Sequence, residues 1–252
     1  MDQLQNLVEK KWTDRASSYC QAVNSELGSF KRQAWLDLIQ GAAPATDRPV
    51  EALDLGTGPG FFAIILAQIG WKVQAVDCTA EMIRHARSNA AHYGVGPQFK
   101  VMDSHNLDFP DDSFDLLLSR NVTWTLRDPE AAYREWRRVL RPGGRLLIFD
   151  SNWYHYKFDP LAAARKAADE KEAFERFGIE PFREPDQELA DTIYSTLPLG
   201  RHPRPQWDQG VLEALGFTGV QTDPDISQLI WDEGERVLYR STPMFMIKAF
   251  KA

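Results

Sequence analysis

Glycines and carboxylates recur at the ends of apolar segments, in a spacing that suits a ribose-containing ligand. The stretch EALDLGTGPGFF places Gly56, Gly58 and Gly60 directly after an apolar run. Asp77 ends the next apolar run, VQAVD, and Asp103 ends a third run, FKVMD. A glycine turn lets the backbone approach a ligand, and a carboxylate about 20 residues further on can accept hydrogen bonds from both hydroxyls of a ribose. For Asp77 alone, an exposed carboxylate or a helix N-cap is the alternative, because DCTAEM could also start a helix.

The details of the glycine loop argue against a phosphate-bearing dinucleotide. The dinucleotide fingerprint is G-x-G-x-x-G, and its third glycine, which packs a helix against a strand, would fall at Phe61. No lysine occurs near the loop, as a Walker-type phosphate site would require. The sequence therefore favours a ribose-containing ligand other than NAD.

The elements that must position these residues alternate between short strands and helices. The strand-like segments are VEALDLG, WKVQAVD, QFKVMD, FDLLLSR and RLLIFDSN, and the helical ones are GFFAIILAQIG, TAEMIRHARSNAAHYG and DPEAAYREWRRVLRPGG. Such alternation indicates right-handed βαβ units and a parallel sheet covered on both faces. The carboxyl ends of the strands then form one ligand-binding edge.

The segments on either side of this core have a different pattern. The first 40 residues are typical of helix, and the chain from Trp153 to about Arg204 is rich in charge, alanine and proline. In that second segment Asp159 is expected to cap a helix that ends near Gly178, and DQELADTIYSTL is expected to form another helix. After these come a helix, WDQGVLEALG, and two strand candidates, TGVQTDP and VLYRSTPMFMIKAF. We therefore expect a helical lid (1–40), a core (41–152), a helical insertion over the ligand edge (153–206) and a C-terminal helix with the final strands (207–252).

The core segments resemble a known family. LDLGTGPGFF, VQAVDCTAEM, FKVMDSHNLDFPDDSFDLLLSRNV and EWRRVLRPGGRLLIFD look like successive motifs of the class I S-adenosylmethionine-dependent methyltransferases, closest to the small-molecule type of quinone-pathway enzymes. The resemblance covers about Val50 to Asp150 and is weak beyond Asn152. It implies an α/β, Rossmann-like fold with helices on both faces of a seven-stranded, mostly parallel sheet whose last strand is antiparallel. It also implies S-adenosyl-L-methionine as the cofactor.

The resemblance implies roles for matching positions. Asp77 would bind the ribose hydroxyls, Cys78 and Met82 would lie against the adenine, and Asp103 with the Ser104 backbone would read the adenine edge. The full set of expected cofactor-binding residues is Tyr19, Asp54, Gly56, Thr57, Gly58, Gly60, Asp77, Cys78, Met82, Asp103, Ser104, Arg120 and Asn121.

Other members of this set would lie near the reacting sulfur or close the site. Arg120 and Asn121 end the fourth strand and would lie near the sulfonium. Tyr19, on the N-terminal helix, would close the site, whereas for Trp12 this role and ordinary packing both remain open. A sulfonium is a cation without phosphate, so carboxylates and carbonyls suit it better than lysines do.

The methyl acceptor is expected to bind beneath the insertion. Methyl transfer from a sulfonium is an in-line displacement with an activated donor, so the protein chiefly supplies proximity and alignment. A general base is needed only if the acceptor must lose a proton. His155 is the candidate base, with a solvated loop histidine as the alternative. The expected acceptor-binding residues are Trp124, Asn152, Trp153 and Tyr154, although the two tryptophans could equally pack the insertion onto the sheet.

Composition bounds the remaining possibilities. A formal net charge of −7 argues against a general nucleic-acid binder. No apolar run approaches the roughly 20 residues that cross a bilayer, and MDQLQNLVEKKW has no apolar core of a signal peptide, so we expect a cytoplasmic protein without membrane contact. Two cysteines, Cys20 and Cys78, and the absence of H-E-x-x-H predict no metal site.

These observations favour a methyltransferase that acts on a small-molecule acceptor, with the O, N, S or C atom undetermined. A nicotinamide-dependent oxidoreductase is the alternative enzyme, disfavoured by Phe61. A non-catalytic cofactor-binding protein of the same fold is the alternative outside enzymes. A homodimer that pairs the C-terminal strands is left open.

Overall fold

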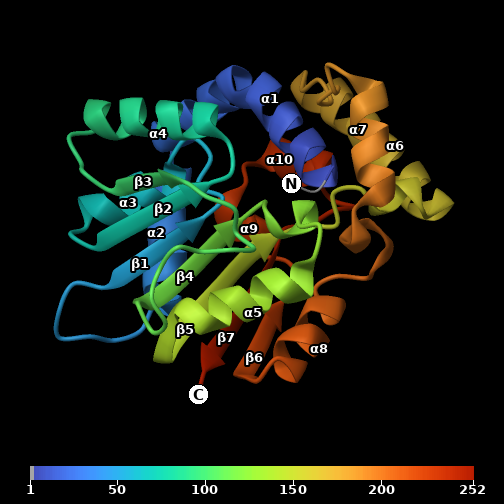
Figure 1. Ribbon diagram of the computed structural model, residues 1–252. Coiled ribbons are helices and arrows are strands. Elements are labelled where there is room, and N and C mark those ends of the chain that lie inside the picture. The colour runs from blue at the N-terminus through green and yellow to red at the C-terminus, as the bar shows by residue number, and fades with distance from the viewer. Residues whose placement is uncertain (1–2) are drawn as a thin grey trace.

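The computed structural model describes residues 3–252, and residues 1–2 of the expected lid lie outside the described part. Its centre is a sheet (Figure 1) formed by β1 (Glu51–Leu55), β2 (Lys72–Asp77), β3 (Gln98–Val101), β4 (Phe114–Arg120), β5 (Leu140–Asp150), β6 (Phe217–Asp223) and β7 (Phe245–Lys251). The strand order is β3-β2-β1-β4-β5-β7-β6, and β7 runs antiparallel to both of its neighbours. This arrangement confirms the expected seven-stranded, mostly parallel sheet with an antiparallel last strand. The order reverses between β1 and β4, where open α/β sheets bind ligands.

Helices cover both faces of the sheet, as expected. They are α1 (Gln3–Leu27), α2 (Lys31–Ala42), α3 (Phe61–Gln68), α4 (Ala80–His92), α5 (Pro129–Val139), α6 (Pro160–Phe177), α7 (Gln187–Thr196), α8 (Gln206–Ala214), α9 (Ser227–Ile230) and α10 (Glu233–Leu238). One apolar core joins α2, α3, α4 and α9 to one face, and a second joins α5 and α8 to the other. Alternate residues of the central strands enter the two cores, so β1 contributes Ala52 to one and Leu53 to the other.

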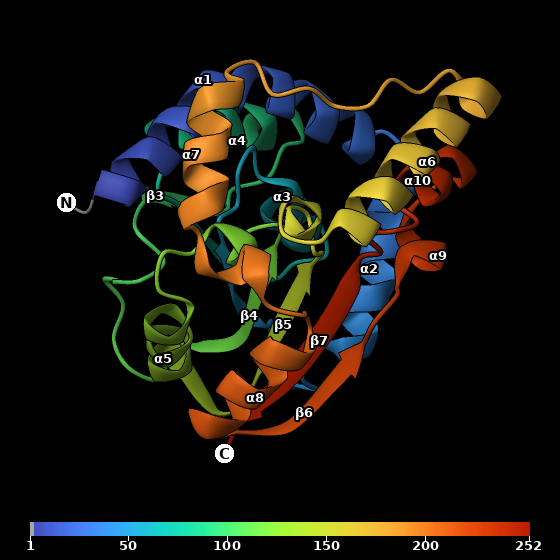
Figure 2. The ribbon, with the colours of Figure 1, turned by 90° about the vertical axis from the view of Figure 1, so that its right-hand side faces the viewer.

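Further helices lie across the carboxyl edge of the sheet. Figure 2 shows α1 running over this edge, with α7 beside it and α6 against α10. The α6 boundaries confirm the sequence-based expectation, because the Asp159 carboxylate accepts a hydrogen bond from Leu161 N at 2.8 Å and Gly178 ends the helix at φ +66°. The edge is therefore covered by elements from both the N-terminal segment and the insertion.

Three boundaries differ from the sequence-based expectation. The first 40 residues form two helices because the chain turns at Gly28. The helix expected over DPEAAYREWRRVLRPGG ends at Val139, since Leu140 already pairs with Phe114 at the start of β5. The strand expected over VLYRSTPMFMIKAF begins only at Phe245, because its first two residues end α10, which a capping box of Asp232 with Glu235 initiates, and a turn follows them.

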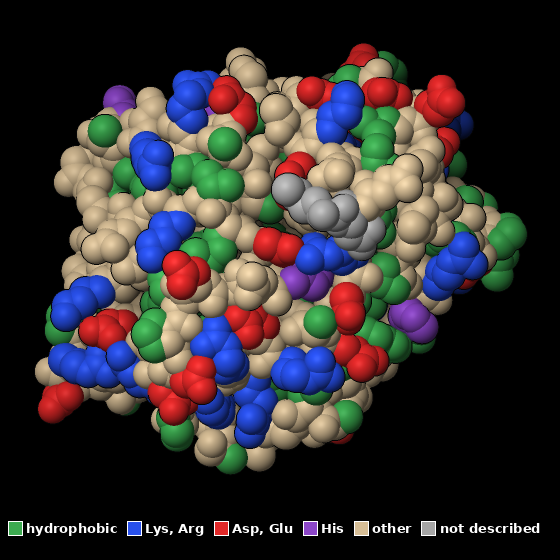
Figure 3. All heavy atoms as spheres, in the orientation of Figure 1, with side chains coloured by type: hydrophobic (Ala, Val, Ile, Leu, Met, Phe, Trp, Pro, Cys, Tyr) green, Lys and Arg blue, Asp and Glu red, His purple; other side chains and the backbone are tan. Residues whose placement is uncertain are grey.

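The surface is mixed in charge. Basic and acidic side chains lie interspersed over the face drawn in Figure 3. Among residues 3–252, no helix is long and apolar enough to cross a membrane.

Candidate active site

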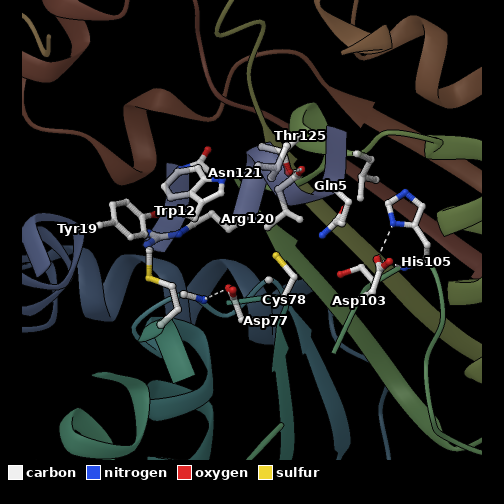
Figure 4. A pocket seen from close by; sticks show the side chains of 17 residues that line it. Gln5, Trp12, Tyr19, Asp77, Cys78, Asp103, His105, Arg120, Asn121 and Thr125 are labelled. Carbon is white, nitrogen blue, oxygen red and sulfur yellow. Dashed lines mark hydrogen bonds and ion pairs between the residues drawn. The ribbon is translucent and has the colours of Figure 1, made fainter. Parts of the chain in front are cut away.

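A cavity, called the first cavity below, lies at the carboxyl edge of the sheet (Figure 4). Trp12 and Tyr19 of α1 lie at one end of it, and Asp103 and His105 at the other (Figure 4). The expected cofactor residues that line it are Tyr19, Gly56, Gly58, Asp77, Cys78, Met82, Asp103, Ser104, Arg120 and Asn121. Strand ends, the following loops and α1 thus bring together residues that lie far apart in the sequence.

The glycine loop brings its backbone to the cavity wall. Gly56 has φ +65° and Gly58 has φ +51°, conformations that side chains disfavour. A Cβ at Gly56 would overlap the Val122 side chain, and one at Gly58 would lie 3.3 Å from the Tyr19 ring. Glycine at both positions therefore allows Val122 and Tyr19 to pack closely against the loop.

Three of the expected cofactor residues do not line the first cavity but support the glycine loop from the side away from it. They are Asp54, Thr57 and Gly60. The buried Asp54 carboxylate accepts hydrogen bonds from the Thr57 hydroxyl at 2.6 Å and from Ala63 N at 3.2 Å. Burial raises the pKa of Asp54 to about 6. A Cβ at Gly60 would lie 3.2 Å from Ala86, so this glycine, one position before Phe61, permits the close packing of α3 against α4.

Asp77 is fixed by the backbone around it. Its two carboxylate oxygens accept hydrogen bonds from Gly58 N and Thr79 N, each at 2.9 Å. Burial raises the pKa of Asp77, and the two backbone N–H groups oppose that rise. Because each carboxylate oxygen can accept more than one hydrogen bond, Asp77 keeps capacity for a ligand's hydroxyls.

Asp103 is held by two side chains that the sequence did not reveal. It accepts from the Arg127 guanidinium at 2.6 Å and from the backbone N–H of His105 at 2.9 Å, and the His105 ring lies 2.7 Å away. Burial raises the pKa of Asp103, but the hydrogen bonds from His105 and Arg127 outweigh it and hold the pKa well below its usual range. Asp103 therefore stays ionised at neutral pH.

The end of β4 carries a strained residue. Asn121 has φ +59°, which is uncommon outside glycine, while its N–H donates to Phe149 O at 2.9 Å and its carbonyl accepts from Trp124 Nε1 at 3.0 Å. Its buried side-chain oxygen has no hydrogen-bond partner among the described residues. A buried oxygen of this kind at a cavity wall suits a ligand that donates a hydrogen bond.

Arg120, next to Asn121, lines the first cavity with its charge already paired. Its guanidinium lies 2.9 Å from Glu26 of α1 and 4.4 Å from the centre of the Phe61 ring. The pair ties α1 to the sheet edge, so Arg120 contributes no unpaired positive charge near the expected sulfonium.

A second cavity shares Trp12, Tyr19 and Asn121 with the first. Of the expected acceptor-binding residues, Trp124, Trp153 and Tyr154 line it. The rest of its wall comes mainly from α6, from the segment before α7 and from residues near α10. Ligands in the two cavities would therefore meet at the shared residues.

Asn152 and His155, also expected at this site, lie elsewhere. Asn152 lines a smaller neighbouring cavity and exchanges hydrogen bonds with the Arg204 backbone. The His155 ring lies 3.2 Å from Gly200 O and 3.8 Å from Asp159, and the described residues that line the two cavities do not include it. His155 thus contacts other parts of the insertion, and its role as a base stays a prediction.

Asp150, at the end of β5, anchors the wall of the second cavity. It is fully buried and accepts hydrogen bonds from Trp124 N at 2.9 Å and Trp153 Nε1 at 3.1 Å. Arg204 pairs with Asp150 at 3.1 Å and with Asp208 at 2.7 Å. This buried network holds both tryptophans, and sequence reasoning missed it because its members come from separate segments.

A second missed cluster joins α1 to the insertion. Lys11 pairs with Glu184 at 3.0 Å and contacts the Tyr194 hydroxyl, and Tyr154 donates to Glu184 at 3.1 Å. Burial lowers the pKa of Lys11 to about 8, although Glu184 opposes the shift. The lid helix and the insertion are thus joined by buried charged groups.

The fold and the strand-edge cavity define a class of protein, the Rossmann-like methyltransferases. Residues 53–148 match the family model for a methyltransferase domain. Over 153 residues the chain is 31% identical to phosphatidylethanolamine N-methyltransferase of Cereibacter sphaeroides, a match that covers 55% of this chain and 73% of that protein. It spans 42% and 39% of the length of two further relatives that it matches.

Solved structures share the fold. Phosphoethanolamine N-methyltransferase 2 of Haemonchus contortus, in complex with phosphomonomethylethanolamine and S-adenosylhomocysteine, matches with a TM-score of 0.63 at 16% identity, over 95% of this chain and 59% of the other. A candidate S-adenosyl-L-methionine-dependent methyltransferase from Methanococcus maripaludis matches with a TM-score of 0.58 at 21% identity, over 95% of this chain and 93% of the other. The chain belongs to the S-adenosylmethionine-dependent methyltransferase family.

The residues of the first cavity fit this cofactor. The buried Asp77 carboxylate suits ribose hydroxyls, and the two glycines at its wall admit a ligand close to the backbone. The unpartnered Asn121 oxygen suits an ammonium or hydroxyl donor. The arginine of this wall is neutralised by Glu26, which suits a cationic sulfonium.

Proposed function

We propose that the protein transfers the methyl group of S-adenosylmethionine to a small molecule bound in the second cavity. The observation that carries this proposal is the wall of Trp12, Tyr19 and Asn121 shared by the two cavities. When bound, the cofactor supplies an activated methyl group. The acceptor's lone pair forms the new bond while the carbon–sulfur bond breaks and leaves its electron pair on sulfur. The protein then contributes proximity and alignment, which can lower a barrier by roughly 7–11 kcal/mol.

In the first cavity, Asp77 would accept hydrogen bonds from the ribose hydroxyls. Cys78 and Met82 would flank the adenine, and Asp103 with Ser104 would lie at its edge. The open backbone at Gly58 would face the methionine portion. These assignments are supported by the positions of these residues on the cavity wall.

In the second cavity, the chain would orient the acceptor and exclude water. Trp124, Trp153 and Tyr154 form an aromatic wall under the insertion, and residues 1–40 and 153–206 would act as lid and cap. Burial raises the pKa of Tyr19 and of Tyr154, so their hydroxyls stay protonated at neutral pH and are poor bases. We therefore propose that this wall orients the acceptor and that these hydroxyls do not act as bases.

Calorimetric titration tests the proposal at its first step. Purified protein is titrated with S-adenosylhomocysteine and, separately, with NAD. We expect micromolar binding of S-adenosylhomocysteine and no binding of NAD, and the reverse result would contradict the proposed function. A radiolabelled methyl-transfer screen then follows. Ethanolamine-type amines belong in it because the names of two relatives refer to such compounds.

A further inference from the structure

The second cavity carries a mixture of charged groups that bears on its acceptor. Its basic side chains are Arg15, Lys166 and Arg183, and its acidic side chains are Glu170 and Glu184. Which of these charges remain available to a ligand depends on the partners that each already has within the protein.

Both carboxylates are already engaged. Glu184 pairs with Lys11 at 3.0 Å and accepts a hydrogen bond from Tyr154 at 3.1 Å. Glu170 forms an ion pair with Lys166, four positions earlier on α6. A cationic acceptor would have to compete with these internal partners, so the wall offers little to an ammonium group.

Two guanidinium groups of the wall remain available to bind a ligand. Arg15 lies 3.8 Å from Glu184, beyond hydrogen-bonding distance, and its buried Nε has no hydrogen-bond partner within residues 3–252. Its guanidinium carbon lies 4.0 Å from the centre of the Phe182 ring, a cation–π contact that restricts where the guanidinium can lie. Arg183, adjacent in sequence to Phe182, forms no ion pair in the described part of the chain. A planar, oriented guanidinium is well suited to bind a carboxylate.

Aromatic rings make up much of the remaining wall. Trp12, Trp124, Trp153, Tyr154 and Tyr239 all line the second cavity. Such rings favour flat partners that stack or meet them edge to face, with about 0.5–1.5 kcal/mol for each ring pair beyond simple burial.

We propose that the acceptor is a ring-bearing organic acid, anchored by Arg15 and Arg183 through its carboxylate while its ring lies among the tryptophans. This inference rests on the proposed function and names the substrate class of the same cavity. The acid group serves as the anchor and not as the methylated atom, because a carboxylate paired with two guanidinium groups is a weakened nucleophile.

The test measures acceptor binding to full-length protein saturated with S-adenosylhomocysteine. The probes are benzoate, 4-hydroxybenzoate and indole-3-carboxylate, with benzylamine as a ring without an acid and phosphoethanolamine as an anion without a ring. The variants are Arg15→Gln and Arg183→Gln. Arg165→Gln is the matched control, since Arg165 is exposed on α6 and is not among the residues of the cavity wall.

We expect the ring acids to bind and the two comparison compounds to bind at least tenfold more weakly. Loss of one charge-assisted hydrogen-bond partner predicts a roughly 10- to 100-fold weaker affinity for the acids in each of the two variants. Arg165→Gln should bind the acids like the unaltered protein. Affinity for S-adenosylhomocysteine should be unchanged in all three variants.

Several results would overturn the inference. They are no binding of any ring acid, tighter binding of benzylamine or phosphoethanolamine, or unchanged acid affinity in a folded Arg183→Gln variant. Arg183 has no ion pair to lose within the described residues, so that variant decides the matter if Arg15→Gln fails to fold. Failure of S-adenosylhomocysteine to bind would instead contradict the proposed function, so the two failures are distinguishable.

Discussion

The first and second cavities share a wall, but different interactions hold their residues in place. The first is fixed by backbone hydrogen bonds at the strand ends, such as Gly58 N to Asp77 and Asn121 N to Phe149 O, both at 2.9 Å. The second is fixed by side-chain pairs across distant segments, such as Lys11 with Glu184 and Arg204 with Asp150.

This difference has a consequence for how the two sites tolerate change. Strand register is set by the whole sheet, so the first cavity depends on the fold itself. A side-chain pair can be removed by one substitution, so the second cavity can change while the sheet persists. We therefore expect substitutions to separate into those that affect cofactor affinity and those that affect only the insertion.

The largest effect is expected at Asp150, where the side-chain network of the second cavity meets the sheet. Asp150→Ala would leave Arg204 buried with Asp208 as its remaining carboxylate partner and would remove the acceptor of Trp124 N and Trp153 Nε1. Breaking a buried pair in this way costs about 3–5 kcal/mol, measured as the free energy of unfolding in urea.

Two variants control this experiment. Asp150→Asn keeps hydrogen-bonding capacity and should lose less stability than Asp150→Ala. Asp159→Ala removes an exposed helix cap and should have a much smaller effect. A loss at Asp150→Ala no greater than that at Asp159→Ala would show that the network does not hold the insertion.

The next effect concerns the first cavity. Asp77→Ala removes two expected charge-assisted hydrogen bonds at about 1.5–3 kcal/mol each, so affinity for S-adenosylhomocysteine should fall by roughly two orders of magnitude or more. Calorimetry measures the affinity, and thermal unfolding checks that the loop survives the loss of the bond to Gly58. Asp77→Asn keeps one carbonyl oxygen, so its affinity for S-adenosylhomocysteine should lie between those of the unaltered protein and of Asp77→Ala. Unchanged affinity in a folded variant would remove Asp77 from the site.

More of the first cavity than of the second could be predicted from the sequence, because the two are held by different kinds of interaction. Asp77 and Asp103 end apolar strands, and strand alternation is a local pattern, so their common edge could be predicted from the residue order alone. Glu184 and Lys11 are 173 positions apart, and no local pattern encodes their pairing. The direction of the His155 side chain could not be predicted, because a polar loop residue has no periodicity to fix it. The side of the loop that Asp54 faces likewise depends on tertiary packing.

A pH dependence is expected from Asp54, which supports the glycine loop from below. Its pKa is raised from 3.8 to about 6 in the folded protein, so between these values the folded state holds a proton that the unfolded state has released. Stability from this group therefore falls as pH rises through that window, by roughly 2–3 kcal/mol in total.

Asp54→Asn isolates this contribution, because its amide oxygen can still accept from Thr57 and Ala63. Urea unfolding at pH 4, 5, 6 and 7 gives the free energy for both proteins. The unaltered protein should lose stability relative to the variant as pH rises through 6, and the loss should level off near pH 7. Parallel curves would show that Asp54 has an ordinary pKa.

The smallest effect is expected at Tyr154, whose hydroxyl donates to Glu184 while its ring stacks on Tyr194 at 3.5 Å between centres. Tyr154→Phe keeps the stack and removes the hydrogen bonds of this hydroxyl to Glu184 and Tyr194, so the free energy of unfolding should fall by about 0.5–1.5 kcal/mol for each. Tyr156→Phe is the matched control, since the Tyr156 hydroxyl makes no hydrogen bond to another described residue. Affinity for S-adenosylhomocysteine should stay unchanged in both variants. If Tyr154→Phe weakened that affinity as much as it weakened folding, the two cavities would not be held independently, because a side-chain contact in the insertion would then support the strand-edge site as well.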